Sequence, residues 1–101
     1  MAQIDFSKSC EEVCNFVRGF NPWPVAYFNL NDDVYKVYVA TAYPSLSGKP
    51  GEILRCSTKQ GLFIACGTGA ISVETIQAPN GKVLRIKDFL NGKSFNVGDI
   101  I

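Results

Sequence analysis

The side chains with the most chemical potential in this chain are carboxylates, thiols and amines, because the sequence contains no histidine. Without histidine, no Ser-His or Cys-His nucleophile pair can form, and no imidazole can act as an acid or base. The carboxylates include two adjacent pairs, Glu11-Glu12 and Asp32-Asp33. Adjacent residues in a helix or a turn point apart, so neither pair is expected to form a catalytic dyad. We predict no catalytic residue; a site built on lysine or on separate carboxylates is the alternative left open.

The four cysteines offer a second kind of chemistry. Cys10 and Cys14 lie one helical turn apart, whereas Cys56 and Cys66 fall in neighbouring predicted strands. Structural zinc sites usually take their thiolates from tighter loop knuckles. The first residues show no signal-peptide pattern, so the oxidising compartments in which disulfides form are not indicated. Each cysteine has apolar neighbours, and we therefore expect buried free thiols in a cytoplasmic protein, with no metal site.

The segment Gly67-Thr68-Gly69 has the flexibility of a phosphate-binding loop but lacks the rest of either nucleotide-binding motif. No helix is predicted to follow it, so no helix N-terminus would face a phosphate. We predict that this segment is a hairpin turn.

The basic side chains are distributed unevenly, although the net charge is only +1. Residues 1–33 carry Lys8 and Arg18 against five carboxylates, and the rest of the chain carries the other eight basic residues against four. Turn residues at one rim of a small barrel would form a groove that follows a phosphate backbone with little sequence preference. The alternative is an ordinary solvated surface. The predicted nucleic-acid-binding residues are Lys36, Lys59, Lys82, Arg85 and Lys87.

Aromatic residues are concentrated in the first half of the chain, where they have two possible roles. Exposed rings on an oligonucleotide-binding barrel can act as stacking platforms for bases. The alternative, which we favour for any one of them, is that they fill the core. The residues in question are Trp23, Tyr27, Phe28, Tyr35, Tyr38 and Tyr43.

A helix is predicted over residues 7–20, with Ser9 and Glu12 forming a capping box and an apolar stripe at helical spacing. The stripe consists of Val13, Phe16, Val17 and Phe20, bordered by Cys10 and Cys14. The two prolines of Asn21-Pro22-Trp23-Pro24 force an extended corner. Short strands are predicted over 25–30, 34–43, 52–57, 62–66, 70–77 and 97–101, with a short helix ending at Gly92. Within 34–43, alternation places Tyr35, Val37 and Val39 on one face.

These elements predict one domain over residues 1–101, of mainly β (α+β) class. Short antiparallel strands with frequent turns curl into a barrel or a sandwich, and we expect a small open Greek-key β-barrel with an N-terminal helix and a short late helix. No apolar run approaches the length of a membrane span.

The string Arg18-Gly19-Phe20-Asn21-Pro22-Trp23-Pro24-Val25-Ala26-Tyr27-Phe28 closely resembles the start of the C-terminal domain of methionyl-tRNA formyltransferases. Lys49-Pro50-Gly51-Glu52-Ile53-Leu54 and the segment from Gly61 to Gly69 resemble the central hairpin region of the same family. Asp88-Phe89-Leu90-Asn91-Gly92 resembles its end. The resemblance covers about residues 4–101, and its most specific part is Asn-Pro-Trp-Pro followed by Pro-Gly-Glu-Ile-Leu.

This resemblance implies a barrel related to oligonucleotide-binding folds that helps to hold initiator tRNA during translation initiation. The family's N-terminal domain, expected to be absent from this chain, binds 10-formyltetrahydrofolate and carries out catalysis, so no cofactor and no catalytic residue are expected here. The implied partners are initiator tRNA and that N-terminal domain. A structural role in a formyltransferase acting on nucleotide sugars is the alternative. Structural roles are assigned to the signature residues Arg18, Asn21, Pro22, Trp23 and Pro24.

Overall fold

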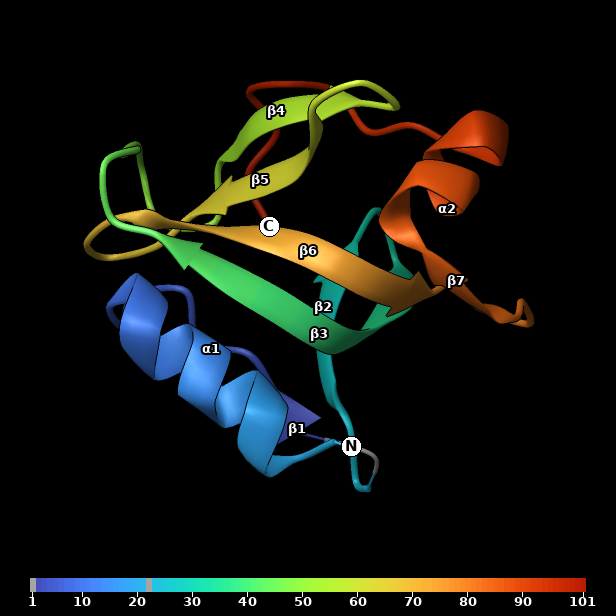
Figure 1. The fold of residues 1–101 in the computed structure, drawn as a ribbon, viewed down its shortest axis with the longest axis horizontal. Coiled ribbons are helices and arrows are strands. Elements are labelled where there is room, and N and C mark those ends of the chain that lie inside the picture. Colours follow the sequence, from blue (N-terminus) through green and yellow to red (C-terminus); the bar gives the residue numbers. More distant parts are fainter. Residues whose placement is uncertain (1, 22) are drawn as a thin grey trace.

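The computed structural model describes residues 2–21 and 23–101, which fold into two helices and a mixed sheet of seven strands that does not close (Figure 1). This confirms the predicted mainly β, open architecture with one helix early and one late in the chain. The elements are β1 (Ala2–Gln3), α1 (Cys10–Gly19), β2 (Ala26–Leu30), β3 (Asp33–Tyr43), β4 (Ile53–Ser57), β5 (Gly61–Ala65), β6 (Ala70–Gln77), β7 (Val83–Arg85) and α2 (Ile86–Gly92).

The strand order is β1-β2-β3-β6-β5-β4, and β7 pairs with β6 beyond this path. Only β1 is parallel to its partner, β2. Strands β4, β5 and β6 follow one another as antiparallel hairpins, and the long connection between β3 and β4 lets β3 lie beside β6. This arrangement is a Greek key.

The turn between β2 and β3 is set by its own residues. Asn31 and Asp32 have φ angles of 52° and 68°, which short polar side chains tolerate best among residues other than glycine. Two successive positive φ angles define the turn whose twist matches the flanking strands. The turn predicted at this point is therefore confirmed.

A bulge in β3 overturns part of its predicted alternation. Val37 lies opposite Ile76 and Ala40 lies opposite Val73, and the register shifts on both sides of Val39. Tyr35 and Val37 are buried as predicted, but Val39 is 45 % exposed. The prediction for Val39 was wrong because the irregular pairing around it interrupts the alternation of β3, so that Ala40 and Ala42 pack against the core in place of Val39.

Helix α1 begins with the predicted capping box. The Ser9 hydroxyl accepts a hydrogen bond from the Glu12 backbone N–H at 3.1 Å, and the Ser9 backbone N–H donates to Glu12 Oε1 at 3.1 Å. The buried face differs from the predicted stripe, because Phe16 and Phe20 are half-buried whereas Cys10 and Cys14 are buried beside Val13 and Val17. The helix is therefore rotated toward its small side chains, which allow it to approach the sheet closely.

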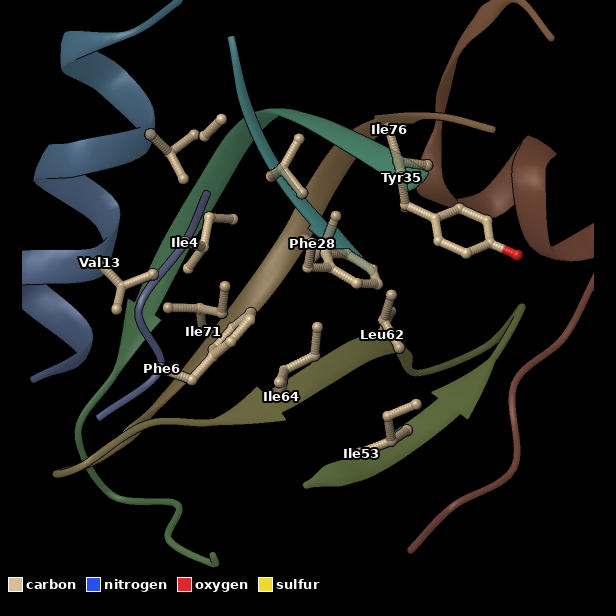
Figure 2. Packing of buried hydrophobic residues seen from close by; sticks show 14 of the residues in the cluster. Ile4, Phe6, Val13, Phe28, Tyr35, Ile53, Leu62, Ile64, Ile71 and Ile76 are labelled. Carbon is tan, nitrogen blue, oxygen red and sulfur yellow. The ribbon is translucent and has the colours of Figure 1, made fainter. Parts of the chain in front are cut away.

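The core fills the space enclosed by the coiled sheet, α1 and α2 (Figure 2). Side chains from β2, β3, β4, β5 and β6 point into it, and Ile4, Phe6 and Val13 join from the N-terminal segment and α1. Phe28 and Tyr35 stack with ring centroids 5.4 Å apart. Each fully buried side chain of this size contributes roughly 1.5–3 kcal/mol.

Helix α2 confirms the predicted late helix, with Phe89 and Leu90 buried. The strand predicted over Val97–Ile101 was wrong in extent, because only one bridge, between Glu52 and Ile100, forms there. A turn with Gly98 at φ 98° interrupts the segment. Its final residues nevertheless run along β4, and the Ile53 backbone N–H donates to the Asp99 carbonyl at 2.9 Å.

The segment Gly67-Thr68-Gly69 is the turn between β5 and β6, as predicted, and it also supports α1. The Gly67 N–H donates to the Lys8 carbonyl at 2.8 Å, and the Cys10 N–H donates to the Thr68 carbonyl at 2.9 Å. A Cβ on Gly67 would lie 2.0 Å from the Ser7 carbonyl oxygen. Glycine is therefore required by the close approach of this turn to the chain before the helix.

Candidate nucleic-acid interface

One row of side chains crosses four strands on the face of the sheet that points away from the core. Tyr27 of β2 pairs with Lys36 of β3, Lys36 pairs with Gln77 of β6, and Gln77 pairs with Val83 of β7. Adjacent strands lie about 4.8 Å apart, so Lys36 and Val83 are separated by about 10 Å. The sheet register thus brings Lys36 next to the strand that follows Lys82.

Arg85 and Lys87 continue this surface toward α2. Arg85 lies opposite Thr75, on the same face as Val83, and is exposed. With Lys87, Thr75 and Glu74 it lines an open groove between β6, β7 and the start of α2, with a volume of about 410 Å³. We call Lys36, Lys82, Arg85 and Lys87 the basic face.

Lys59, the fifth predicted residue, lies apart from the other four. It is exposed in the turn between β4 and β5, whereas Lys82 follows the turn between β6 and β7. Figure 1 shows both turns at the same end of the molecule, with α2 between them. The structure therefore places Lys36, Arg85 and Lys87 along one surface, with Lys82 directly before β7, and it places Lys59 in a separate turn beyond the late helix.

The charges of the basic face are not neutralised within the protein. Among the described residues, the only ion pair joins Lys93 Nζ to Asp33 Oδ2 at 4.0 Å. The Tyr35 hydroxyl raises the pKa of Lys93, and Asp33 adds to the same effect. Lys93 thus has a carboxylate partner, whereas none of the cations of the basic face forms an ion pair within the described residues.

One carboxylate shares the groove. Glu74 is exposed, and its Oε2 accepts a hydrogen bond from the Ser72 hydroxyl at 2.6 Å. A negative charge here opposes an anionic ligand at Arg85 and Lys87. Glu74 was not singled out from the sequence, and only the pairing of β6 with β7 reveals it.

A cluster of one cation and two aromatic rings on the sheet was also not predicted from the sequence. The Arg55 guanidinium lies 5.5 Å from the centroid of the Phe63 ring, and Tyr43 meets the same ring edge-on at 4.8 Å. Arg55 and Phe63 are cross-strand partners in β4 and β5. The sequence alone did not reveal this cluster, because the aromatic partners of Arg55 lie on other strands and follow only from the register.

The aromatic residues singled out from the sequence are less buried than expected. Phe28 and Tyr35 are each 1 % exposed and belong to the core. Trp23 is 81 % exposed and Tyr43 is 41 % exposed. Tyr27 and Tyr38 are half-buried on the outer row. The expectation that most of them fill the core was wrong for this set, because alternate strand positions and the corner before β2 face solvent.

The signature segment after α1 forms a corner that is tied to β3. The Asn21 side-chain amide donates to the Tyr38 carbonyl at 2.8 Å, and Arg18 Nη1 donates to Asn15 Oδ1 at 2.6 Å. The peptide bond between Trp23 and Pro24 is cis. Pro22, assigned a structural role from the sequence, lies outside the described residues.

The cysteines are free thiols, and three of them are buried as expected. Burial raises the pKa of Cys14 to about 11 and that of Cys66 to about 12. Both are therefore protonated and unreactive at neutral pH. Cys56 is half-buried, and its sulfur accepts a hydrogen bond from the Phe95 backbone N–H at 3.3 Å. No group of three potential metal ligands occurs among the described residues.

The open Greek-key sheet with its two helices places the chain among the small, mainly β domains. Residues 1–94 match the family described as "Formyl transferase, C-terminal domain". The chain belongs to this family. Neither of the described helices is both long enough and apolar enough to cross a lipid bilayer.

The curated relatives described next are each named methionyl-tRNA formyltransferase. The methionyl-tRNA formyltransferase of Clostridium novyi is 41 % identical over 102 residues, covering 100 % of this chain and 33 % of the relative. That of Streptococcus uberis is 41 % identical over 100 residues, covering 96 % and 31 %. That of Pseudomonas fluorescens is 40 % identical over 102 residues, covering 99 % and 31 %. The chain thus spans about a third of the length of these relatives.

Proposed function

We propose that this chain is a tRNA-binding module of a cytoplasmic methionyl-tRNA formyltransferase and has no catalytic activity alone. In this role it contributes to the formylation of initiator methionyl-tRNA in translation initiation. The observation that carries the proposal is the basic face, whose cations have no carboxylate partner in a chain similar to enzymes named for tRNA. Side chains of this kind contact phosphates and therefore position RNA without reading its sequence.

The geometry of the basic face suits a sugar-phosphate chain. Lys36 and Arg85 project from strands that lie about 10 Å apart, and Lys87 extends the surface onto α2. Several phosphates can therefore be contacted along one path across the sheet. Each cation that neutralises a phosphate releases counterions, so affinity is expected to fall steeply with salt.

The central test measures tRNA affinity of the chain between about 50 and 200 mM salt. We expect each of Lys36→Ala, Arg85→Ala and Lys87→Ala to weaken binding and to reduce the salt slope by about 1. Lys8→Ala is the matched control, because Lys8 precedes α1 and its backbone contacts the turn between β5 and β6 rather than β7 or α2. Affinity that does not change with salt, or equal losses for Lys8→Ala and Arg85→Ala, would overturn the proposal.

A variant of Glu74 tests the same groove with the opposite expected change in tRNA affinity. Its carboxylate lines the same groove as Arg85, so Glu74→Gln removes a repulsive charge from the proposed RNA path. We expect Glu74→Gln to strengthen tRNA binding and Arg85→Gln to weaken it, each by a few-fold. The same direction of change in both variants would show that the groove does not face RNA.

The formyl donor, expected to be 10-formyltetrahydrofolate, is proposed to bind a separate N-terminal domain. One hollow of the described chain, lined by Ile4, Asp5, Lys8, Glu12, Val13 and Phe16, measures about 210 Å³. Ligand pockets usually measure about 300–1,000 Å³. This hollow is smaller than that range, and we assign the chain the roles of holding tRNA and of partnering that domain.

A further inference from the structure

Trp23 is a large apolar side chain that the fold leaves in solvent. It is 81 % exposed and is the only tryptophan in the chain. Most of the indole surface is apolar and is favourably removed from water, and tryptophan is enriched at binding interfaces. The exposed ring therefore contributes little to this domain's own stability and is available to a partner.

The corner that carries Trp23 is held in place by hydrogen bonds on both sides. The Val25 backbone N–H donates to the Phe20 carbonyl at 2.7 Å and closes the loop. The Asn21 amide donates to the carbonyl of Tyr38, which lies in the β3 bulge and has no partner residue on β6. The indole is thus presented from a fixed backbone, which lowers the entropy lost when a ligand binds.

The surroundings of the corner favour an anionic partner over a basic or purely apolar one. A hollow of about 120 Å³ beside it is lined by Arg18, Asn21, Tyr38 and Val39, together with small buried side chains. Arg18 is its only charged residue. The hollow and the basic face share one connection, because the Tyr38 hydroxyl donates to Gln77 Oε1 at 2.9 Å and Gln77 pairs with Lys36.

We propose that Trp23 is a stacking platform for an unpaired nucleotide base of the bound RNA, with the flanking phosphate at Arg18. This inference rests on the proposed function and adds to it a contact with a base. Every base offers a π-face, so the contact tolerates any sequence but requires a base that is free of a helix. Cations position the backbone, while the indole favours the unpaired part of the RNA.

The single tryptophan provides a direct probe, because all indole fluorescence of the chain comes from Trp23. We expect tRNA, which has an unpaired 3′ end, to quench this fluorescence in parallel with binding measured by filter retention. A blunt-ended RNA duplex is expected to bind through the basic face without quenching. Quenching by the duplex equal to that by tRNA would overturn the stacking proposal.

Variants separate stacking from charge. We expect Trp23→Ala to weaken tRNA binding by about 5- to 100-fold without changing the salt slope, and Trp23→Phe to restore part of the affinity. Arg18→Ala is expected to lower the slope by about 1. Val97→Ala is the control, since Val97 is also exposed, at 63 %, but lies in the C-terminal segment, far from the corner in Figure 1.

The outcomes distinguish the two proposals. If tRNA binds with a steep salt dependence but Trp23→Ala binds equally well and no quenching occurs, the stacking contact is wrong and the RNA-binding function stands. Trp23 would then be assigned to contact with another protein domain. If tRNA does not bind at any salt concentration, both proposals fail.

Discussion

The two helices of this domain differ in how the residues at their ends stabilise them. Helix α1 has a capping box at Ser9, two acidic residues in its first turn and Arg18 in its last turn, all of which favour the helix. Helix α2 has Arg85 at its N-cap with no side-chain hydrogen bond, has Lys87 beside a single acidic residue, Asp88, in its first turn, and has no basic residue in its last turn. Cations near a helix N-terminus are unfavourable.

The start of α2 is therefore less well stabilised than the start of α1, and it carries surface charge instead. The residues that make α2 a poor isolated helix, Arg85 and Lys87, are the ones that line the proposed RNA groove. Residues that disfavour the local secondary structure without a structural benefit are expected at functional sites. Helix α2 must then be held by its packing alone, whereas α1 is supported by both its ends and its packing.

The largest expected effect is the loss of the packing that holds α2. Phe89 is 5 % exposed, and the centroid of its ring lies 6.1 Å from that of Tyr35 and 5.8 Å from that of Phe95. We expect Phe89→Ala to cost about 3–5 kcal/mol in the free energy of unfolding. Phe16→Ala in α1, where the ring is half-buried, is expected to cost about 1–2 kcal/mol. Urea denaturation measures both; equal losses would contradict the comparison.

The next effect concerns how α1 is seated on the sheet. Gly67→Ala places a Cβ 2.0 Å from the Ser7 carbonyl oxygen, so the chain before α1 must move. We expect a loss of about 1–3 kcal/mol. Gly92→Ala in α2 is the control, since a Cβ there meets nothing within 4 Å and alanine favours a helix. Thermal denaturation of the two variants should give shifts of opposite sign.

Sequence patterns predicted the parts of this fold that depend on adjacent residues. The Ser9 capping box, the Asn31-Asp32 turn and the helix ending at Gly92 are each determined within a few positions. The exposure of Val39 could not be predicted, because its bulge arises from the pairing of β3 with β6. The corner that carries Trp23 is likewise tied to the distant Tyr38, by the side chain of Asn21.

The candidate site was predicted in part for the same reason. Lys36, Lys82, Arg85 and Lys87 were selected by charge, but only the strand register puts Lys36 and Arg85 on one face of the sheet, and only the start of α2 adds Lys87 to the groove of Arg85. Lys59 was grouped with them as a turn residue, and α2 separates it from the rest. Glu74 was overlooked because its groove combines strands with a helix that follows β7.

Removing the cap of α1 and adding one to α2 tests the comparison of the two helices directly, and each change is expected to alter the free energy of unfolding by about 1 kcal/mol. Ser9→Ala removes the cap of α1 and is expected to cost that amount. Arg85→Ser gives α2 a capping residue at a position whose φ and ψ of −64° and 147° suit one, and is expected to add about 0.5–1 kcal/mol. The same variant is expected to weaken tRNA binding. A loss of stability in Arg85→Ser would show that Arg85 has a structural role.

The smallest effect is the pH dependence of the α1 cap. The Ser9 backbone N–H, followed by its hydroxyl, lowers the pKa of Glu12 below its usual value of 4.5. Because the folded pKa is depressed, the contribution of Glu12 is complete above pH 4.5 and is lost as the pH falls through the folded value.

Glu12→Gln isolates this contribution, since glutamine retains a side-chain oxygen that can accept from Ser9. We expect the variant to melt slightly below the original chain at pH 7, and we expect this difference to shrink as the pH falls below 4.5. The pKa of Asp5 is also lowered, chiefly by the Ser7 hydroxyl, and both chains keep Asp5, so its titration cancels in the difference. A difference in melting temperature that does not vary between pH 3 and 7 would mean that the ionised carboxylate adds nothing to the α1 cap. The contrast with α2 would then rest on the Ser9 hydroxyl and the buried face alone.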